Sequence, residues 1–132
     1  MSRARAGSKD DAVALVKKAA DYVKTYGLEK ALKEFNNPHS PFVKDDLYVF
    51  AQDTGGVMRA HPQKQVLVGK YVADLKDANG KFFGKEIMDM GKSKGSGWVD
   101  YDWMNPATDE VEEKSTYLLR SDNMILCCGV YR

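Results

Sequence analysis

The sequence predicts an α+β domain in which a long N-terminal helix precedes a five-stranded antiparallel sheet, with helical and loop segments between the second and third strands. Two observations carry this prediction. Apolar residues between positions 9 and 26 recur at spacings of three and four, the periodicity of an amphipathic helix. Residues 97–132 contain three runs rich in β-branched and aromatic residues, separated by turn formers. Such a three-stranded meander needs a partner over one face, and the rest of the chain can supply it.

The length and composition fit one globular domain. The chain has 132 residues, of which 43% are hydrophobic and 30% charged. Its 20 basic and 19 acidic residues give a net charge of +1, so no large field favours nucleic acid. No run of about 18 apolar residues predicts a transmembrane segment. We expect residues 1–8 to be a disordered tail or a remnant of processing or expression, and 9–132 to form the domain.

Two helices are expected at the start of the domain. Ser8, followed three residues later by Asp11, is a plausible N-cap arrangement, and Gly27 occupies the position that usually follows a helix C-terminus. The first helix should therefore run from residue 9 to about 26. A second, short helix over 28–35 places its apolar residues on one side and ends before a proline-containing loop.

A hairpin should follow these helices. Residues 47–52 form a strand by composition, and the turn signal at 53–56 leads into a second strand over 57–61. Pro62 lacks an N–H for the ladder, so this strand must stop. After a segment of mixed character, helical spacing returns over 82–93. The order of elements, completed by the meander, predicts a PAS-like architecture.

The first strand of the meander has two faces, and either can point inward. One face carries Val99, Tyr101 and Trp103, whereas the other carries Trp98, Asp100 and Asp102. The more apolar set is expected to face the core or a pocket. Tyrosine and tryptophan keep a polar tip that needs a partner when buried, so they occur both in cores and in pocket walls. The pattern alone does not choose between these two roles.

Motifs of catalysis are missing from the sequence. It contains no G-x-S-x-G, H-E-x-x-H, C-x-x-C, P-loop or G-x-G-x-x-G. The run Asp77-Ala-Asn-Gly80 begins like a calcium loop, but Lys81, Phe82 and Met88 occupy the positions that need an oxygen ligand, a glycine and an acid. We therefore expect no catalytic residue, cofactor or metal site.

His61 and Lys114 are the most informative polar residues. The imidazole of His61, at a strand end and followed by proline, can donate to an anion or an amide oxygen, or it can merely cap the strand by bonding a loop carbonyl. Lys114 stands in the middle of a strand, where lysine usually faces solvent. If it points inward it must meet an anion, because a lone buried ammonium is costly.

Eight blocks, taken in order, resemble the single Cache domain family, and the resemblance covers roughly residues 12–131. The blocks are Asp46-Leu-Tyr-Val-Phe, Ala60-His-Pro62, Leu67-Val-Gly-Lys70, Leu75-Lys-Asp-Ala-Asn-Gly80, Gly97-Trp-Val-Asp-Tyr-Asp-Trp103, Asn105-Pro106, Lys114-Ser-Thr-Tyr117 and Gly129-Val-Tyr131. Members of this family are extracytoplasmic sensor domains of bacterial chemoreceptors and histidine kinases. The resemblance implies a PAS-like sheet and a small-molecule pocket between the sheet and the segment that joins its second and third strands.

The resemblance to the second Cache subtype also implies a ligand class and a set of binding residues. The ligand would be a short-chain carboxylate such as acetate, propionate, pyruvate or lactate. The implied site residues are Tyr48, His61, Tyr101, Trp103, Lys114 and Tyr117. Lys114 and His61 would meet the carboxylate, the phenols would hydrogen-bond it, and Trp103 would close the apolar side. In a regular strand Lys114 and Tyr117 point to opposite faces, so without a bulge at most one of them faces the pocket.

Three functions stay open at this point. The leading one is a periplasmic or otherwise extracytoplasmic sensor without catalysis, which would need a signalling partner protein and could form a homodimer through its N-terminal helix. The alternative is a structural or dimerisation domain without a small-molecule ligand. An enzyme using His61 with Asp100 or Asp102 ranks last, because no paired acid and base stand at a fixed spacing.

Overall fold

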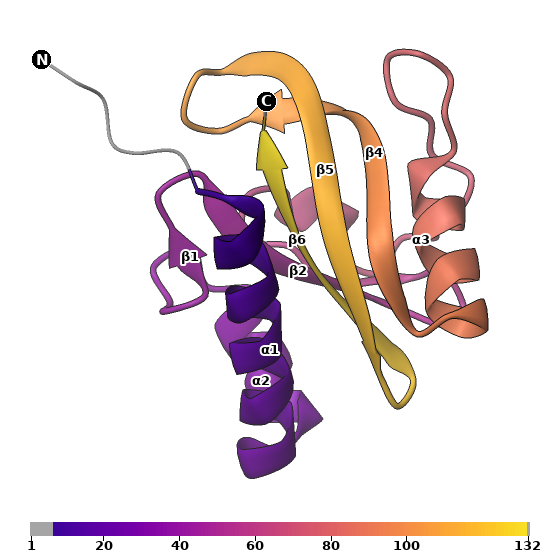
Figure 1. Ribbon diagram of the computed structural model, residues 1–132. Coiled ribbons are helices and arrows are strands. Elements are labelled where there is room, and N and C mark those ends of the chain that lie inside the picture. Colours follow the sequence, from indigo (N-terminus) through magenta and orange to yellow (C-terminus); the bar gives the residue numbers. More distant parts are fainter. Residues whose placement is uncertain (1–6, 132) are drawn as a thin grey trace, which may run out of the picture.

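A long N-terminal helix lies against one side of a twisted antiparallel sheet in the computed structural model, which describes residues 7–131 (Figure 1). The expectation for the N-terminal tail lies, for residues 1–6, outside the described residues. The helical elements are α1 (Lys9–Tyr26), α2 (Leu28–Phe35), the 3₁₀ turn η1 (Gln65–Leu67) and α3 (Phe83–Ser93). The strands are β1 (Val43–Lys44), β2 (Leu47–Asp53), β3 (Met58–Ala60), β4 (Ser96–Asn105), β5 (Glu110–Ser121) and β6 (Met124–Tyr131).

The sheet confirms the predicted PAS-like α+β architecture. Its strand order is β1-β2-β6-β5-β4, with β3 also paired to β2, and all pairs are antiparallel. The chain thus enters the centre of the sheet at β2, goes to the edge strand β3, and returns through the meander β4-β5-β6. The two-residue strand β1 was not predicted, because two residues carry no alternating pattern.

Local sequence signals explain how these elements begin and end. The Ser8 hydroxyl accepts a hydrogen bond from the Asp11 amide at 3.1 Å, and the Asp11 carboxylate accepts one from the Ser8 amide at 3.0 Å, so the expected N-cap is a full capping box. Gly27 ends α1 with a φ of 90°, a conformation that favours glycine. In the β2–β3 hairpin, the Asp53 carboxylate accepts bonds from the amides of Gly55 and Val57, each at 3.0 Å.

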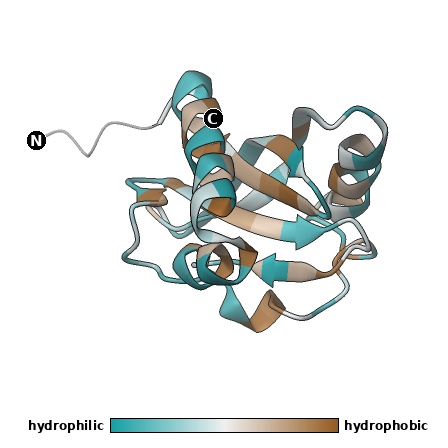
Figure 2. Ribbon diagram, turned by 90° about the horizontal axis from the view of Figure 1, so that it is seen from below, coloured by the Kyte–Doolittle hydropathy of each residue, from teal (hydrophilic) through white to brown (hydrophobic). Residues whose placement is uncertain are grey.

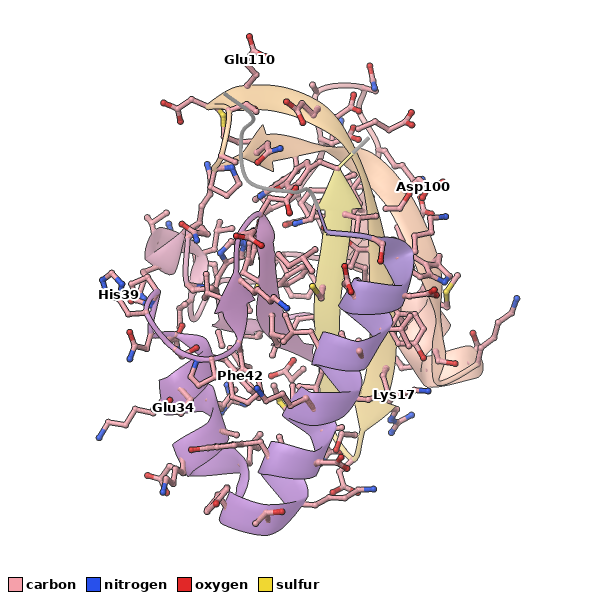
Figure 3. All side chains as sticks on the ribbon, turned by 60° about the vertical axis from the view of Figure 1, so that its left-hand side comes forward. Lys17, Glu34, His39, Phe42, Asp100 and Glu110 are labelled. Carbon is pink, nitrogen blue, oxygen red and sulfur yellow. The ribbon has the colours of Figure 1, made fainter. Side chains whose placement is uncertain are left out.

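The sheet has an apolar layer on each face, and each helix carries both hydrophobic and hydrophilic residues (Figure 2). Helices α1 and α2 cover one face, where Phe42 packs edge-on against Phe35. Figure 3 shows Phe42 beside α1. Helix α3 and the segment that follows β3 cover the opposite face. Along β2, β4, β5 and β6, successive residues belong alternately to the two layers.

Candidate ligand-binding site

A lysine lies buried in the middle of the sheet. Lys114 stands on β5 directly opposite Tyr101 of β4 and Tyr131 of β6, so these three side chains share the face that α3 covers. Its side chain is 1% exposed, and its ammonium donates a hydrogen bond to the phenol oxygen of Tyr48 at 2.9 Å. The structure therefore gives Lys114 the inward orientation that the sequence left open.

Four aromatic rings surround this ammonium. Its Nζ lies 4.4 Å from the ring centroid of Tyr48, 5.0 Å from that of Phe50, 5.3 Å from that of Tyr131 and 5.8 Å from that of Tyr101. Ring faces carry negative charge density and attract a cation within about 6 Å. The rings come from three strands, so only the folded sheet assembles them around Lys114.

Phenols and aromatic ring faces stabilise the charge of Lys114. Within residues 7–131 no carboxylate forms an ion pair with it. Burial lowers the pKa of Lys114, but the phenols of Tyr101, Tyr48 and Tyr131 raise it more, and the pKa lies well above its ordinary value. The site therefore holds a desolvated cation for which the described part of the chain supplies no anionic partner.

A chain of hydroxyl groups leads away from Lys114. The Tyr131 phenol donates to the backbone oxygen of Met104 at 2.9 Å, and it lies 3.4 Å from the phenol oxygen of Tyr48. Because Tyr131 uses its one proton on Met104, the Tyr48 phenol must donate to it, which leaves the Tyr48 oxygen free to accept from Lys114. The sequence of donors is thus fixed from Lys114 through Tyr48 and Tyr131 to Met104.

His61 lies beside the same rings, one residue beyond the end of β3. It is 2% exposed, and its ring packs 5.4 Å from that of Phe50 at an angle of 29° and 5.1 Å from that of Tyr48. Its Nδ1 accepts hydrogen bonds from the backbone amides of Lys64 at 2.9 Å and Gln63 at 3.3 Å. His61 therefore fixes the loop as an acceptor, and its proton is on Nε2.

The imidazole of His61 is neutral near pH 7. Burial, together with smaller effects of the ammonium groups of Lys114 and Lys64, lowers its pKa from 6.5 to about 3. A neutral imidazole with Nδ1 occupied presents one donor, the Nε2–H group. The Nε2–H group can donate a hydrogen bond to an anion while the imidazole stays neutral.

Helix α3 adds an apolar wall. The Phe83 ring stacks on that of Tyr101 with a centroid distance of 4.5 Å and an angle of 10°, and it meets the Trp103 ring edge-on at 5.1 Å. Trp103 in turn lies 6.3 Å from the His61 ring. The hydroxyl of Tyr101 is paired with that of Thr116 at 2.9 Å. The face of β4 that carries Tyr101 and Trp103 is thus the inward one, as predicted.

A cavity of about 360 Å³ adjoins this cluster, between the loop after β3 and the turn that joins β4 to β5. Tyr48, the hydrogen-bond partner of Lys114, lines it. The full lining consists of Tyr48, Gln63, Lys64, Trp103, Met104, Pro106 and Asp109. The cavity therefore gives a small molecule a path from solvent to the phenol that covers the buried ammonium.

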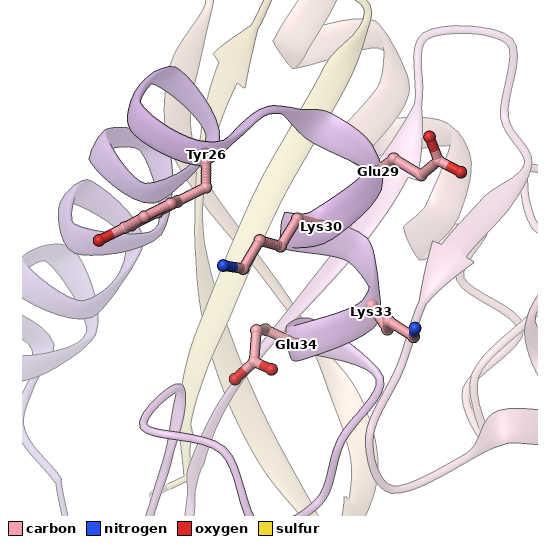
Figure 4. A pocket seen from close by; sticks show the side chains of 5 residues that line it. All are labelled: Tyr26, Glu29, Lys30, Lys33 and Glu34. Atoms are coloured by element: carbon pink, nitrogen blue, oxygen red, sulfur yellow. The ribbon is translucent and has the colours of Figure 1, made fainter.

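A larger cavity, about 730 Å³, lies on the other side of the sheet along α2 (Figure 4). Its lining consists of Tyr26, Glu29, Lys30, Lys33 and Glu34, none of which is buried. Two carboxylates accompany the two ammonium groups, and the Lys30 ammonium rests 4.6 Å from the ring centroid of Tyr26. A solvated groove with balanced charges lacks the desolvated cation found beside Tyr48, so we place the candidate site at Lys114.

The structure brings together five of the six residues that the sequence analysis named. Tyr48, His61, Tyr101, Trp103 and Lys114 share one layer, whereas Tyr117 lies on the opposite face of β5 under α1. There its ring packs 5.3 Å from that of Trp98. Strand β5 has no bulge between positions 114 and 121, so the parity of a regular strand separates Tyr117 from Lys114.

The sequence analysis missed several residues of the cluster. Phe50 could have been found, because it follows Tyr48 by two positions and so faces the same way. Tyr131 required knowledge of the strand register, and Phe83 required the packing of α3. The second histidine, His39, is exposed on the loop between α2 and β1 and points outward (Figure 3).

Known proteins share this fold. The family model of single Cache domain 2 matches residues 3–131. A methyl-accepting chemotaxis protein from Vibrio parahaemolyticus RIMD 2210633 is 25% identical with a TM-score of 0.80, over 93% of this chain and 87% of that one. A Cache chemosensory domain described for its carboxylic acid recognition is 26% identical with a TM-score of 0.82, over 92% of this chain and 91% of that one.

A third structure, the periplasmic sensor domain of a chemotaxis protein, shares the fold at 22% identity with a TM-score of 0.70, over 92% of this chain and 88% of that one. In the described part of this chain, no helix is both long and apolar enough to cross a membrane. Cache domains are extracytoplasmic or periplasmic sensor domains. Since the family match extends over nearly all of its length, the chain belongs to the single Cache domain 2 family.

Proposed function

We propose that this domain binds a short-chain carboxylate in the extracytoplasmic space and passes the binding event to a signalling partner, with no catalysis of its own. One observation carries the proposal: the Lys114 ammonium is fully buried, and its partners are phenols and ring faces rather than a carboxylate. A bound carboxylate would supply the missing negative charge in a place shielded from water, where an ion pair is strong.

The donors around Lys114 suit a carboxylate. An ammonium has three N–H groups, and the hydrogen bond to Tyr48 uses one of them. In the proposed complex, another N–H of Lys114 and the Nε2–H of His61 bind the two carboxylate oxygens. The neighbouring rings of Phe83 and Trp103 then cover the apolar end of the ligand.

The carboxylate class gains support from a relative. The Cache chemosensory domain that is 26% identical over 92% of this chain is described for carboxylic acid recognition. Acetate, propionate, pyruvate and lactate differ in size and in polar substituents while sharing the carboxylate. They are therefore the first compounds to test.

Calorimetric titration and thermal unfolding with these four acids test the proposal. At a ligand concentration 100 times the dissociation constant, the fold should gain about 2.7 kcal/mol. Lys114→Met should abolish this gain, whereas Lys85→Met, which changes an exposed lysine on α3, should keep it. The absence of any response to all four acids, in protein whose fold is verified by circular dichroism, would overturn the proposal.

Dimerisation through α1 is a separate part of the proposal. The outward side of α1 carries Lys17, Lys18, Asp21 and Lys24, a net charge of +2, so two copies repel each other there and a dimer should strengthen when salt screens this repulsion. Light scattering at low and high ionic strength checks this. A monomer under both conditions would exclude this dimer while leaving carboxylate binding untouched.

A further inference from the structure

The cavity beside Tyr48 holds a second ammonium group at its mouth. Lys64 lies on the loop after β3, is exposed, and lines the cavity together with Trp103. Its Nζ lies 5.5 Å from the centroid of the Trp103 ring. The backbone amide of the same residue is bonded to Nδ1 of His61, which fixes this part of the loop to the site.

Lys64 and Lys114 belong to one site, but Lys114 is buried and Lys64 is exposed. Lys114 lies behind Tyr48, whereas Lys64 lies toward solvent over Trp103. Neither ammonium forms an ion pair with a carboxylate of residues 7–131. Both act on His61, whose pKa they lower together with burial. A molecule that reaches from the Tyr48 phenol to the Trp103 ring would meet a cation at each end.

We infer that the site favours short dicarboxylates, with one carboxylate on Lys114 and the other received by Lys64 at the cavity mouth. This inference rests on the proposed function, because it presumes a first carboxylate at Lys114. It goes further by naming Lys64 as the residue that distinguishes a diacid from a monoacid of the same length.

The carboxylate of Asp109 should oppose binding of a second ligand carboxylate. Asp109, in the turn between β4 and β5, lines the same cavity and is exposed. Its negative charge repels a second ligand carboxylate. Removing that charge should therefore strengthen diacid binding, just as removing the charge of Lys64 should weaken it. Asparagine also tolerates the positive φ of 62° at this position.

The experiment compares succinate with butyrate and with monomethyl succinate by calorimetry. Succinate and butyrate both have a chain of four carbons. In monomethyl succinate a neutral methyl ester replaces one carboxylate of succinate. Because Lys64 is exposed, its pairing should strengthen succinate binding by about fivefold over either monoacid. This advantage should shrink with added salt, since exposed charges are screened.

Three variants isolate the role of Lys64. Lys64→Met should remove the succinate advantage by weakening succinate binding more than butyrate binding, whereas Asp109→Asn should enlarge the advantage. Lys76→Met is the matched control, because the Lys76 ammonium also lies over an aromatic ring, 5.2 Å from the centroid of Phe82, but outside the cavity lining.

Two failures can be told apart. If succinate and butyrate bind equally, or if Lys64→Met weakens both to the same extent, the inference is wrong and the carboxylate proposal stands. If no acid binds, the proposed function is wrong and the inference falls with it. A Lys64→Arg variant that keeps the succinate advantage would support charge recognition.

Discussion

Gly129 of β6 gives the side chain of Lys114 its space. A Cβ atom built at Gly129 would overlap Cε of Lys114 and the hydroxyl oxygen of Thr116, which stands opposite Gly129 in the ladder. The backbone of Gly129 has no positive φ, so the requirement is for space rather than for conformation. The buried lysine and the glycine beside it therefore form one structural unit.

Gly129→Ala should displace the Lys114 stem and weaken carboxylate binding. Forcing a methyl group into a packed interior costs about 1–3 kcal/mol of unfolding free energy. Chemical denaturation measures that cost, and calorimetry measures the loss of ligand. The control is Gly55→Ala in the β2–β3 turn, where the nearest atom to a new Cβ is a carboxylate oxygen of Asp53 at 3.3 Å. Equal ligand affinity in Gly129→Ala and wild type would contradict this account.

Lys114→Met should abolish ligand binding without unfolding the protein. The substitution shortens the side chain by one atom and removes a buried charge that no carboxylate of residues 7–131 compensates. Replacing buried charges by apolar side chains of similar volume is often neutral or stabilising by about 1–4 kcal/mol. Urea denaturation without ligand checks this. A large loss of stability would mean that Lys114 holds the sheet together and is not reserved for a ligand.

Tyr131→Phe should weaken ligand binding by breaking the chain of hydroxyl groups. Without the Tyr131 phenol, Tyr48 loses its acceptor and the backbone oxygen of Met104 loses its donor. The expected cost is about 1 kcal/mol of stability and a severalfold rise in the dissociation constant. Tyr117→Phe is the matched control, because it removes a phenol from the opposite face of the neighbouring strand. A similar loss of affinity in both variants would argue against a role for the chain of hydroxyl groups.

His61 should make the protein less stable in acid. Its folded pKa of about 3 lies below the ordinary value of 6.5, so between these values the unfolded chain binds a proton that the folded chain does not. From pH 6.5 down to 3, this one group should lower the unfolding free energy by about 1.4 kcal/mol per pH unit. Above pH 6.5 it has no effect.

Denaturation of wild type and His61→Gln at several pH values isolates the contribution of His61. Carboxylates affect both proteins alike, so the difference between the two curves belongs to His61. The wild-type curve should fall more steeply between pH 6 and 4. Parallel curves would show that the pKa of His61 does not differ between the folded and unfolded states.

The sequence predicted most of the fold because its local signals are strong. The capping box at Ser8, the hairpin turn at Asp53 and the alternation around Tyr101 each act within a few residues, and each is confirmed. Strand β1 was not predicted, because its pairing with β2 depends on the fold of the preceding loop and the strand has no sequence pattern of its own.

The candidate site was less predictable, because it depends on register and packing. Parity already warned that Lys114 and Tyr117 could not both face inward, but it did not say which one would. Tyr131 became part of the site only through its pairing with Lys114, and Phe83 only through its stacking on Tyr101. Such relations join residues that are far apart in the chain, and a single sequence does not contain them.

A crystal structure of the domain with bound propionate would show whether Lys114 binds the carboxylate. We predict that the carboxylate oxygens lie about 2.7–2.9 Å from Nζ of Lys114, with Nε2 of His61 donating to one of them. Propionate bound elsewhere, for instance beside Lys30 and Lys33 in the groove along α2, with Lys114 contacting phenols alone, would contradict the account.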